Sequence, residues 1–476
     1  MAGNRVLLLL LFAASGGAAL IYEVVWFQLL QLVIGSSAVS LGLLLATFMG
    51  GMCAGSLLLP RYIARDAHPL RVYALLEAGI GLLALVVLIV MPLAGAVYSP
   101  TAGYGVRGIL LRGLVAMIVL LPPTLLMGAT LPAIARWVEL TPRGVSWLGF
   151  FYGGNIAGAV AGCLLAGFYL LRVHDMTVST FAGVAINGAV AGAAWLLASR
   201  TPHDSEDPSL PQTAVERHAP TTINHQPSTN SQQPATIYLA IAISGLTALG
   251  SQVIWTRLLS LLVGATVYAF AIILAVFLFG LGLGSTLGAS LSRTTTRPRL
   301  ALGSCQLALM GAIAWAAYML TDGLPYWPIN PSLVTSAAIV FQVDLVRAAW
   351  VVLPGAILWG ASFPLALAAV ASEGADPGRV VGRVYAANTA GAIAGALAAS
   401  LFLVESLGTM RAQQIFLALS AIAACFAMAP LLWTSPAAAR KTAEPPLGTF
   451  GFTVVVVALV AALWTVNRLP AVPGML

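Results

Sequence analysis

Charged side chains are scarce in this sequence. Asp, Glu, Lys and Arg together make up 8 % of the 476 residues, whereas a soluble domain carries about 25 % to cover the surface that faces water. Hydrophobic residues make up 60 % of the chain, and apolar runs of about 20 residues recur, each long enough to cross the bilayer core. This composition excludes a water-soluble enzyme, a nucleic-acid-binding protein and a disordered chain. It predicts a helical membrane protein that crosses the lipid bilayer many times.

Cysteine is rare too, and the sequence lacks the common catalytic motifs. Four cysteines occur, all in apolar segments and without CxxC or CxxCH spacing: Cys53, Cys163, Cys305 and Cys425. Neither a disulfide framework, a zinc site nor an attached haem is therefore expected. The sequence also contains no GxSxG, HExxH or Walker motif. We expect no metal, no cofactor and no catalytic site, so the chain is not expected to be an enzyme.

Thirteen apolar runs are predicted to be membrane-spanning helices. They cover residues 6–34, 39–60, 70–98, 110–135, 146–171, 176–199, 236–263, 266–291, 300–321, 343–371, 380–404, 411–434 and 448–467. Fifteen Lys and Arg residues fall on the N-terminal side of the membrane and six on the other, with Arg257 inside a span. Because basic loops stay in the cytoplasm, we expect a cytoplasmic N-terminus and, with an odd number of spans, an external C-terminus. The expected location is a bacterial-type inner membrane.

The two halves of the chain are similar to each other. Three stretches align, each at its own offset of 229, 232 or 233 residues. They are Ser15–Trp26 on Ser244–Trp255, continuing to Glu77 on Gln306; Pro122–Pro132 on Pro354–Pro364; and Tyr152–Gly162 on Tyr385–Gly395. The first segment therefore recurs in mid-chain, which argues against its being a cleaved signal peptide.

The repeat predicts how the chain is organised. Residues 1–199 and 236–434 each hold six predicted spans, and 200–235 is a polar linker expected to be flexible and cytoplasmic. Six is even, so both halves start on the same side of the membrane and are parallel repeats. We therefore predict an all-α integral membrane protein, a major-facilitator-like 6+6 bundle. Residues 435–476 add a cytoplasmic loop and one more helix, giving about thirteen spans.

Four segments resemble the membrane region of the spermidine-synthase-like membrane proteins, often described as a major-facilitator-like domain fused to a spermidine synthase. The segments are SGxxALIYEVVW near the start, RxxxRDxxPLRxYALLExGIG after the second span, LMGATLP in the fourth and GRVYAANTAGAIAGA in the eleventh. The resemblance implies a polyamine or other small cation as the solute. Fused members also carry a soluble aminopropyltransferase domain, and these 476 residues contain nothing of that composition.

Ionisable residues inside spans are costly, and they are functional candidates for that reason. Glu23 lies in the first span with Tyr22 and Trp26, and its repeat partner Gln252 lies near Trp255 and Arg257. Two further candidate pairs are related by the repeat: Glu77 with Gln306, and Asn155 with Asn388. These ten residues form the predicted substrate-binding set.

Structural interpretations of the same residues stay open. Glu23 and Arg257 would form an ion pair across the two-fold axis, and Glu77 would pair with Arg71 at the membrane surface. The asparagines would close helix contacts, and the tryptophans would pack in the core or lie in the interfacial belt.

Prolines recur at matching places in the fourth and tenth predicted spans: Pro122, Pro123, Pro132, Pro354 and Pro364. We expect them to interrupt these helices and to free carbonyl groups toward a cavity.

Two functions from different classes fit these observations. The first is a secondary transporter that alternates access to a site near Glu23, Trp26, Gln252 and Arg257. The second is a membrane subunit or scaffold that docks a separately encoded enzyme or a larger complex, with the unpaired thirteenth helix as the docking element.

Overall fold

Long helices make up almost all of the structure. The computed structural model describes residues 2–34, 37–62, 67–98, 106–139, 145–201, 233–327, 336–370 and 377–433, with 453, 456–457, 460–461 and 464 near the C-terminus. Within these ranges the regular elements are helices, and no strand occurs. The described residues include eleven helical stretches long and apolar enough to cross a membrane. The chain is a multi-pass helical membrane protein.

The first half of the chain forms six long helices and two short elements. These are α1 (Ala2–Ile34), α2 (Ser37–Tyr62), α3 (Pro69–Tyr98), α4 (Val106–Glu139), α5 (Val145–Leu165), the π-helix η1 (Ala166–Leu170), α6 (Leu171–Val173) and α7 (Met176–Arg200). Asp175 caps α7, because its Oδ1 accepts a hydrogen bond of 2.8 Å from the Val178 backbone N–H. The predicted spans of this half lie within these helices.

The described part of the second half of the chain also forms six long helices, with three short elements. Its elements are α8 (Gln233–Val263), α9 (Val267–Thr294), α10 (Pro298–Tyr318), η2 (Met319–Gly323), η3 (Leu324–Tyr326), α11 (Ala337–Val370), α12 (Pro377–Ala398), η5 (Ala399–Leu403) and α13 (Val404–Trp433).

One apolar stretch of the second half is too long for a single span. It runs from Gly382 to Ala429 over 48 residues, but Gly408 inside it has φ +78° and a non-helical conformation. Only glycine adopts this backbone region at little cost. The chain turns at Gly408, between the predicted spans 380–404 and 411–434. The thirteenth predicted span, 448–467, lies largely outside the described residues, although the six described there are helical and exposed.

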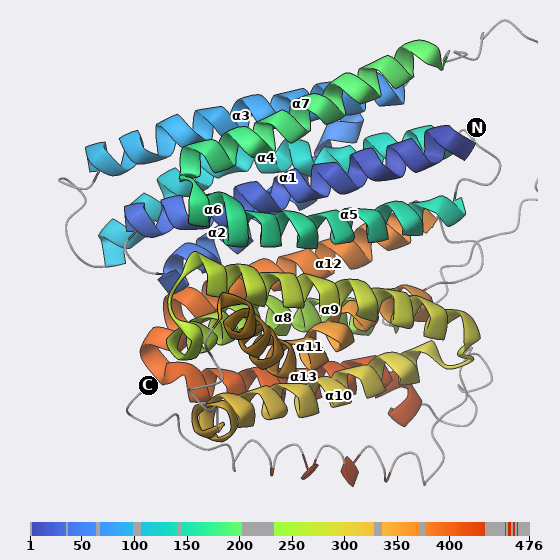
Figure 1. Cartoon of the computed structure of the whole chain (residues 1–476). Coiled ribbons are helices and arrows are strands. Elements are labelled where there is room, and N and C mark those ends of the chain that lie inside the picture. Colours follow the sequence, from blue (N-terminus) through green and yellow to red (C-terminus); the bar gives the residue numbers. More distant parts are fainter. Residues whose placement is uncertain are drawn as a thin grey trace, which may run out of the picture.

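Helices of each half pack on one another in the same pairs. In the first half α1 contacts α5, α2 contacts α4, and α3 contacts α7; in the second half α8 contacts α12, α9 contacts α11, and α10 contacts α13. Figure 1 shows the two groups as adjacent bundles, blue to green above and yellow to orange below. The most extensive contacts between the bundles are α2 with α12 and α5 with α9.

Glycine allows the helices of each pair to approach closely. A Cβ atom built on Gly158 would collide with the backbone of Ala13 in α1, and one built on Gly391 would collide with Ala242 in α8. These two contacts are related by the sequence offsets of the repeat, 229 and 233. Small residues are favoured at helix contacts in membranes, because lipid provides no hydrophobic force between helices.

The prolines do not interrupt their helices, so that expectation is wrong. The prolines at 122, 123 and 132 lie inside the continuous α4, and Pro354 and Pro364 lie inside the continuous α11. A proline in a helix leaves the carbonyl four residues earlier without its usual partner. For Pro354 that carbonyl belongs to Trp350, and the Trp315 indole N–H of α10 donates to it at 3.0 Å. A neighbouring helix replaces the missing hydrogen bond, and the helix continues.

Candidate functional site between the two bundles

A small cavity lies between the two bundles, where α1 and α8 end and α2 and α9 begin. Its volume is about 50 Å³, room for a few water molecules. Twelve residues line it: Phe27, Gln28, Gln31, Ala38, Leu41, Val253, Thr256, Arg257, Ser260, Ala265, Thr266 and Phe270. Both bundles therefore contribute to its wall.

Positions related by the repeat face each other across this cavity. Offsetting residues 27, 28, 31 and 41 by 229 gives residues 256, 257, 260 and 270, and all eight line the cavity. The cavity thus lies where an axis relating the two halves would pass. Its floor is aromatic, since the rings of Phe27 and Phe270 lie 4.2 Å apart between centroids.

Glu23 lies one helical turn from this floor on α1. Its side chain is 5 % exposed, and that of its repeat partner Gln252 on α8 is 2 % exposed. Cys163 of α5 is close enough to interact electrostatically with Glu23. Both Glu23 and Gln252 are buried near the junction of the bundles, and Glu23 is a carboxyl group in a largely apolar setting.

Arg257 lines the cavity, and its side chain is exposed. The structure records no ion pair between Glu23 and Arg257, although both lie in its described part. The structural ion pair between these two residues that the sequence left open is therefore not observed. Arg257 instead supplies the cavity with its charge.

Glu77 lies elsewhere, in a buried polar network inside the first bundle. Ser15 Oγ donates to its Oε1 at 2.6 Å, and Asn187 Nδ2 donates to its Oε2 at 2.6 Å. Tyr22 OH in turn donates to Asn187 Oδ1 at 2.6 Å, and the Tyr22 ring stacks on Trp26 with centroids 5.6 Å apart. The network joins α1, α3 and α7, so it fixes these helices to one another.

Arg71 is not the described partner of Glu77. Its guanidinium lies 5.8 Å from the ring centroid of Trp195, a cation–π contact. The described contacts therefore do not pair Glu77 with Arg71 at the membrane surface.

The second bundle repeats the start of this network with neutral groups. Gln306 Nε2 donates to Ser244 Oγ at 3.1 Å, and Ser244 lies 3.0 Å from the hydroxyl of Ser362. Gln306 and Ser244 are the repeat partners of Glu77 and Ser15. The same backbone positions hold a carboxylate network in one half and an amide network in the other.

Trp255 and the two asparagines take part in helix packing. Trp255 is buried, and its indole N–H donates to Gln413 Oε1 at 3.1 Å. Asn155 Nδ2 donates to the Phe12 carbonyl at 3.0 Å and so links α5 to α1. Asn388 lies at the equivalent place in α12, where its backbone carbonyl is against Gly245 of α8.

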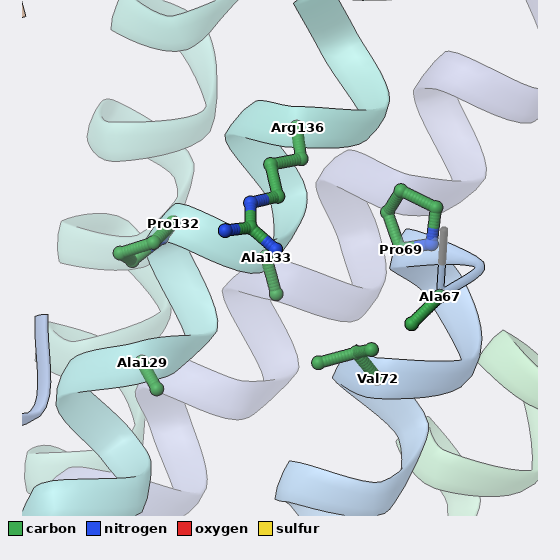
Figure 2. Close-up of a pocket in the computed structure, with 7 residues that line it drawn as sticks. All are labelled: Ala67, Pro69, Val72, Ala129, Pro132, Ala133 and Arg136. Carbon is green, nitrogen blue, oxygen red and sulfur yellow. The ribbon is translucent and has the colours of Figure 1, made fainter. Parts of the chain in front are cut away.

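A second, smaller hollow of about 10 Å³ lies at the opposite end of the first bundle. Figure 2 shows it between the start of α3, with Pro69 and Val72, and the end of α4, where the side chain of Arg136 runs back toward Ala133. Its wall belongs to the first half alone. It is too small for anything larger than a water molecule.

The structure brings some predicted residues together and separates others. Glu23, Gln252 and Arg257 gather near the cavity, whereas Glu77 and Gln306 lie in separate networks. Gln28 and Asn187 were not among the predicted residues. Gln28 is the repeat partner of Arg257, and Asn187 is a polar residue in mid-span, so both had a signal in the sequence.

Comparison with known proteins adds no assignment: no family model matches this sequence, and no curated protein matches it.

Proposed function

We propose that this chain is a secondary transporter of a small polar solute, built from two six-helix halves in a major-facilitator-like arrangement. The observation that carries the proposal is the cavity between the halves, whose wall pairs residues of α1 with their repeat partners in α8. A site shared by two repeats is typical of transporters that move one repeat against the other. A scaffold has no need of such a cavity.

The packing supports two halves that move as units. Contacts within each half are backbone-close at glycine, as at Gly158 and Gly391, and they occur at repeat-related positions. In these contacts the nearest obstructing atoms belong to the backbone of the neighbouring helix, so they cannot rotate away when the helices shift. The helices within a half are therefore expected to stay together while the halves rock.

Two of the three π-helices in the described residues, η1 and η5, support the location of the moving interface. η1 and η5 are related by the offset of 233, as their bounds Ala166–Leu170 and Ala399–Leu403 show. π-Helices are rare and are frequently found at functional sites. Each lies at the C-terminal end of a helix that contacts the other bundle.

η1 and η5 pack across the interface in the same way. A Cβ atom built on Gly167 of η1 would collide with Ala271 of α9, and one built on Gly42 of α2 would collide with Ser400 of η5. Gly42 and Ala271 are repeat partners, as are Gly167 and Ser400. The contacts on the two sides of the interface are therefore related by the same repeat as the halves. This arrangement supports a mechanism in which the halves rock about one axis.

The role of Glu23 in energy coupling provides the test. The full chain is reconstituted in liposomes and assayed for uptake of polyamines, amino acids, organic cations and organic anions, with and without a proton gradient. Glu23→Gln places at position 23 the amide that its repeat partner already has, so the fold is expected to be kept. We expect this variant to lose gradient-driven accumulation, because a buried ionisable group that carries the proton is gone. The control is Glu405→Gln, at an exposed acid of α13.

The outcomes separate the claims. If no solute is transported by the wild type, the transporter proposal fails. If Glu23→Gln and wild type give the same flux, Glu23 has no part in the mechanism. The polyamine cation implied by the resemblance remains a prediction that the solute panel tests directly.

The alternative function, a membrane scaffold for a separately encoded enzyme, rests on the segment 448–467. Of its described residues, Val457, Val460 and Trp464 are about 60 % exposed. Purification of the full chain in mild detergent discriminates the two functions. A partner that stays bound in equal amounts, together with no uptake in liposomes, favours the scaffold.

A further inference from the structure

The cavity between the bundles carries a positive charge. Arg257 is the one ionisable side chain among its twelve lining residues, and no carboxylate lines it. Its repeat partner Gln28 faces it from α1, so the charge comes from one half only. A cationic solute would meet a guanidinium here and be repelled.

The polar groups around Arg257 include hydrogen-bond donors. Thr256 is 5 % exposed, and its hydroxyl is buried without a hydrogen-bond partner among the described residues. A buried hydroxyl normally has a hydrogen-bond partner, so an additional group in the cavity, such as a ligand or a water molecule, would satisfy the Thr256 hydroxyl. The side-chain amides of Gln28 and Gln31 and the hydroxyls of Ser260 and Thr266 complete the polar part of the wall.

We propose that this cavity binds an oxyanion group, a carboxylate or a phosphate, through the Arg257 guanidinium and the Thr256 hydroxyl. A guanidinium holds two oxygens of such a group in parallel, and hydrogen bonds between charged groups are stronger than neutral ones. The inference rests on the proposed function in one respect: as a transporter, the protein would carry a small organic or inorganic oxyanion.

The cavity size limits the ligand. A volume of about 50 Å³ fits acetate or a phosphate group, and a larger molecule would place only its charged end here. The oxyanion has two sources, a free solute or the headgroup of an anionic lipid. The experiment separates them.

The test measures binding by the purified full chain, independently of transport. Its melting temperature in a phospholipid-free detergent is followed while acetate, phosphate or spermidine is added, with chloride balancing the ionic strength. We expect saturable stabilisation by acetate and phosphate and none by spermidine. In a second arm, the protein is placed in nanodiscs of phosphatidylcholine alone or with phosphatidylglycerol. Stabilisation by phosphatidylglycerol and by neither free anion assigns the cavity to a lipid headgroup.

Three variants tie binding to the cavity. Arg257→Gln, which leaves glutamine at both related positions, should weaken anion binding about tenfold or more, the usual effect of losing a charge-assisted hydrogen bond. Arg293→Gln, at an exposed arginine of α9 outside the cavity, should change nothing. Thr256→Val keeps the side-chain shape and should also weaken binding.

The internal symmetry allows a sharper variant. The exchange Gln28→Arg with Arg257→Gln moves the guanidinium to the related position across the cavity. It should restore most of the binding that Arg257→Gln loses, which a general loss of folding would not allow.

Anion binding that is equal in wild type and Arg257→Gln, or stabilisation by spermidine alone, overturns the inference. Anion binding without any transport keeps this site and removes the proposed function. Transport that is indifferent to Arg257→Gln and to added anions keeps the proposed function and removes this site.

Discussion

Replacing Gly158 or Gly391 by alanine tests whether the two halves are packed in the same way. A Cβ atom at position 158 would lie 2.9 Å from Ala13 Cα and closer still to the Ala13 carbonyl, and one at 391 would lie 2.9 Å from Ala242 Cα. Ordinary contact begins near 3.4 Å, so α5 and α12 would each have to retreat by more than an ångström to clear the carbonyl oxygen. The obstructing atoms are backbone and cannot rotate away.

The expected cost follows from this geometry. Inserting a methyl group into a packed contact costs about 1–3 kcal/mol. Alanine without a clash instead favours a helix over glycine by about 0.5–1 kcal/mol. Gly153 in α5 and Gly382 in α12 have nothing within 4 Å of an added Cβ, so they are the matched controls. The gain in helix propensity is common to a clashing variant and its control, so each clashing variant should be less stable than its control by about 1–3 kcal/mol.

The assay is the loss of monodisperse protein on heating in detergent, followed by size-exclusion chromatography of a fluorescent fusion. We expect melting temperatures several degrees lower for Gly158→Ala and Gly391→Ala than for Gly153→Ala and Gly382→Ala. The losses at 158 and 391 should be similar. If one of the two alanines is tolerated as well as its control, the equivalence of the two helix pairs is refuted.

Two further predictions concern a proline and the topology. Trp315→Phe removes the donor to the Trp350 carbonyl and should lower the free energy of unfolding by about 1–2 kcal/mol. In a Pro354→Ala background the backbone N–H of residue 354 can donate to that carbonyl, so the same substitution should cost almost nothing. An equal cost in both backgrounds would contradict this account. The sequence also predicts an external C-terminus, so alkaline phosphatase fused after Leu476 should be active and a cytoplasmic fluorescent reporter dark, whereas the reverse pattern would indicate a miscounted span.

The positions of the described helices were predictable because they depend on local sequence. Apolar runs of spanning length must form helices in lipid, where every backbone hydrogen bond has to be made within the segment. Gly408 marks the turn between two long helices, and the predicted spans 380–404 and 411–434 end and begin on either side of it.

The polar contacts were only partly predictable, because they depend on how helices are rotated against one another. Glu77 is hydrogen-bonded to Ser15 and Asn187 and is not paired with Arg71, although Arg71 is nearer to it in the sequence. Hydropathy gives no rotation angle, and a side chain reaches a partner only when both helices present the right face. The continuous α11 was missed for the same reason, since the donor that replaces its proline-lost hydrogen bond belongs to another helix.

The two halves agree where helices touch and differ where charge is placed. A glycine against a neighbouring backbone admits no other side chain without a shift, and such contacts recur at related positions, as Gly158 and Gly391 show. Positions 23 and 28 hold Glu and Gln in the first half, whereas their partners 252 and 257 hold Gln and Arg. Exchanging each of these residues keeps a polar side chain of similar length while it changes the charge. At these related positions the buried acid Glu23 therefore lies near the cavity in the first half, whereas the second half places Arg257 in the cavity wall. A solute in the cavity would experience an asymmetric electrostatic field. Its orientation would therefore be set by side chains that differ between the halves, because helix packing does not fix the charge at these positions.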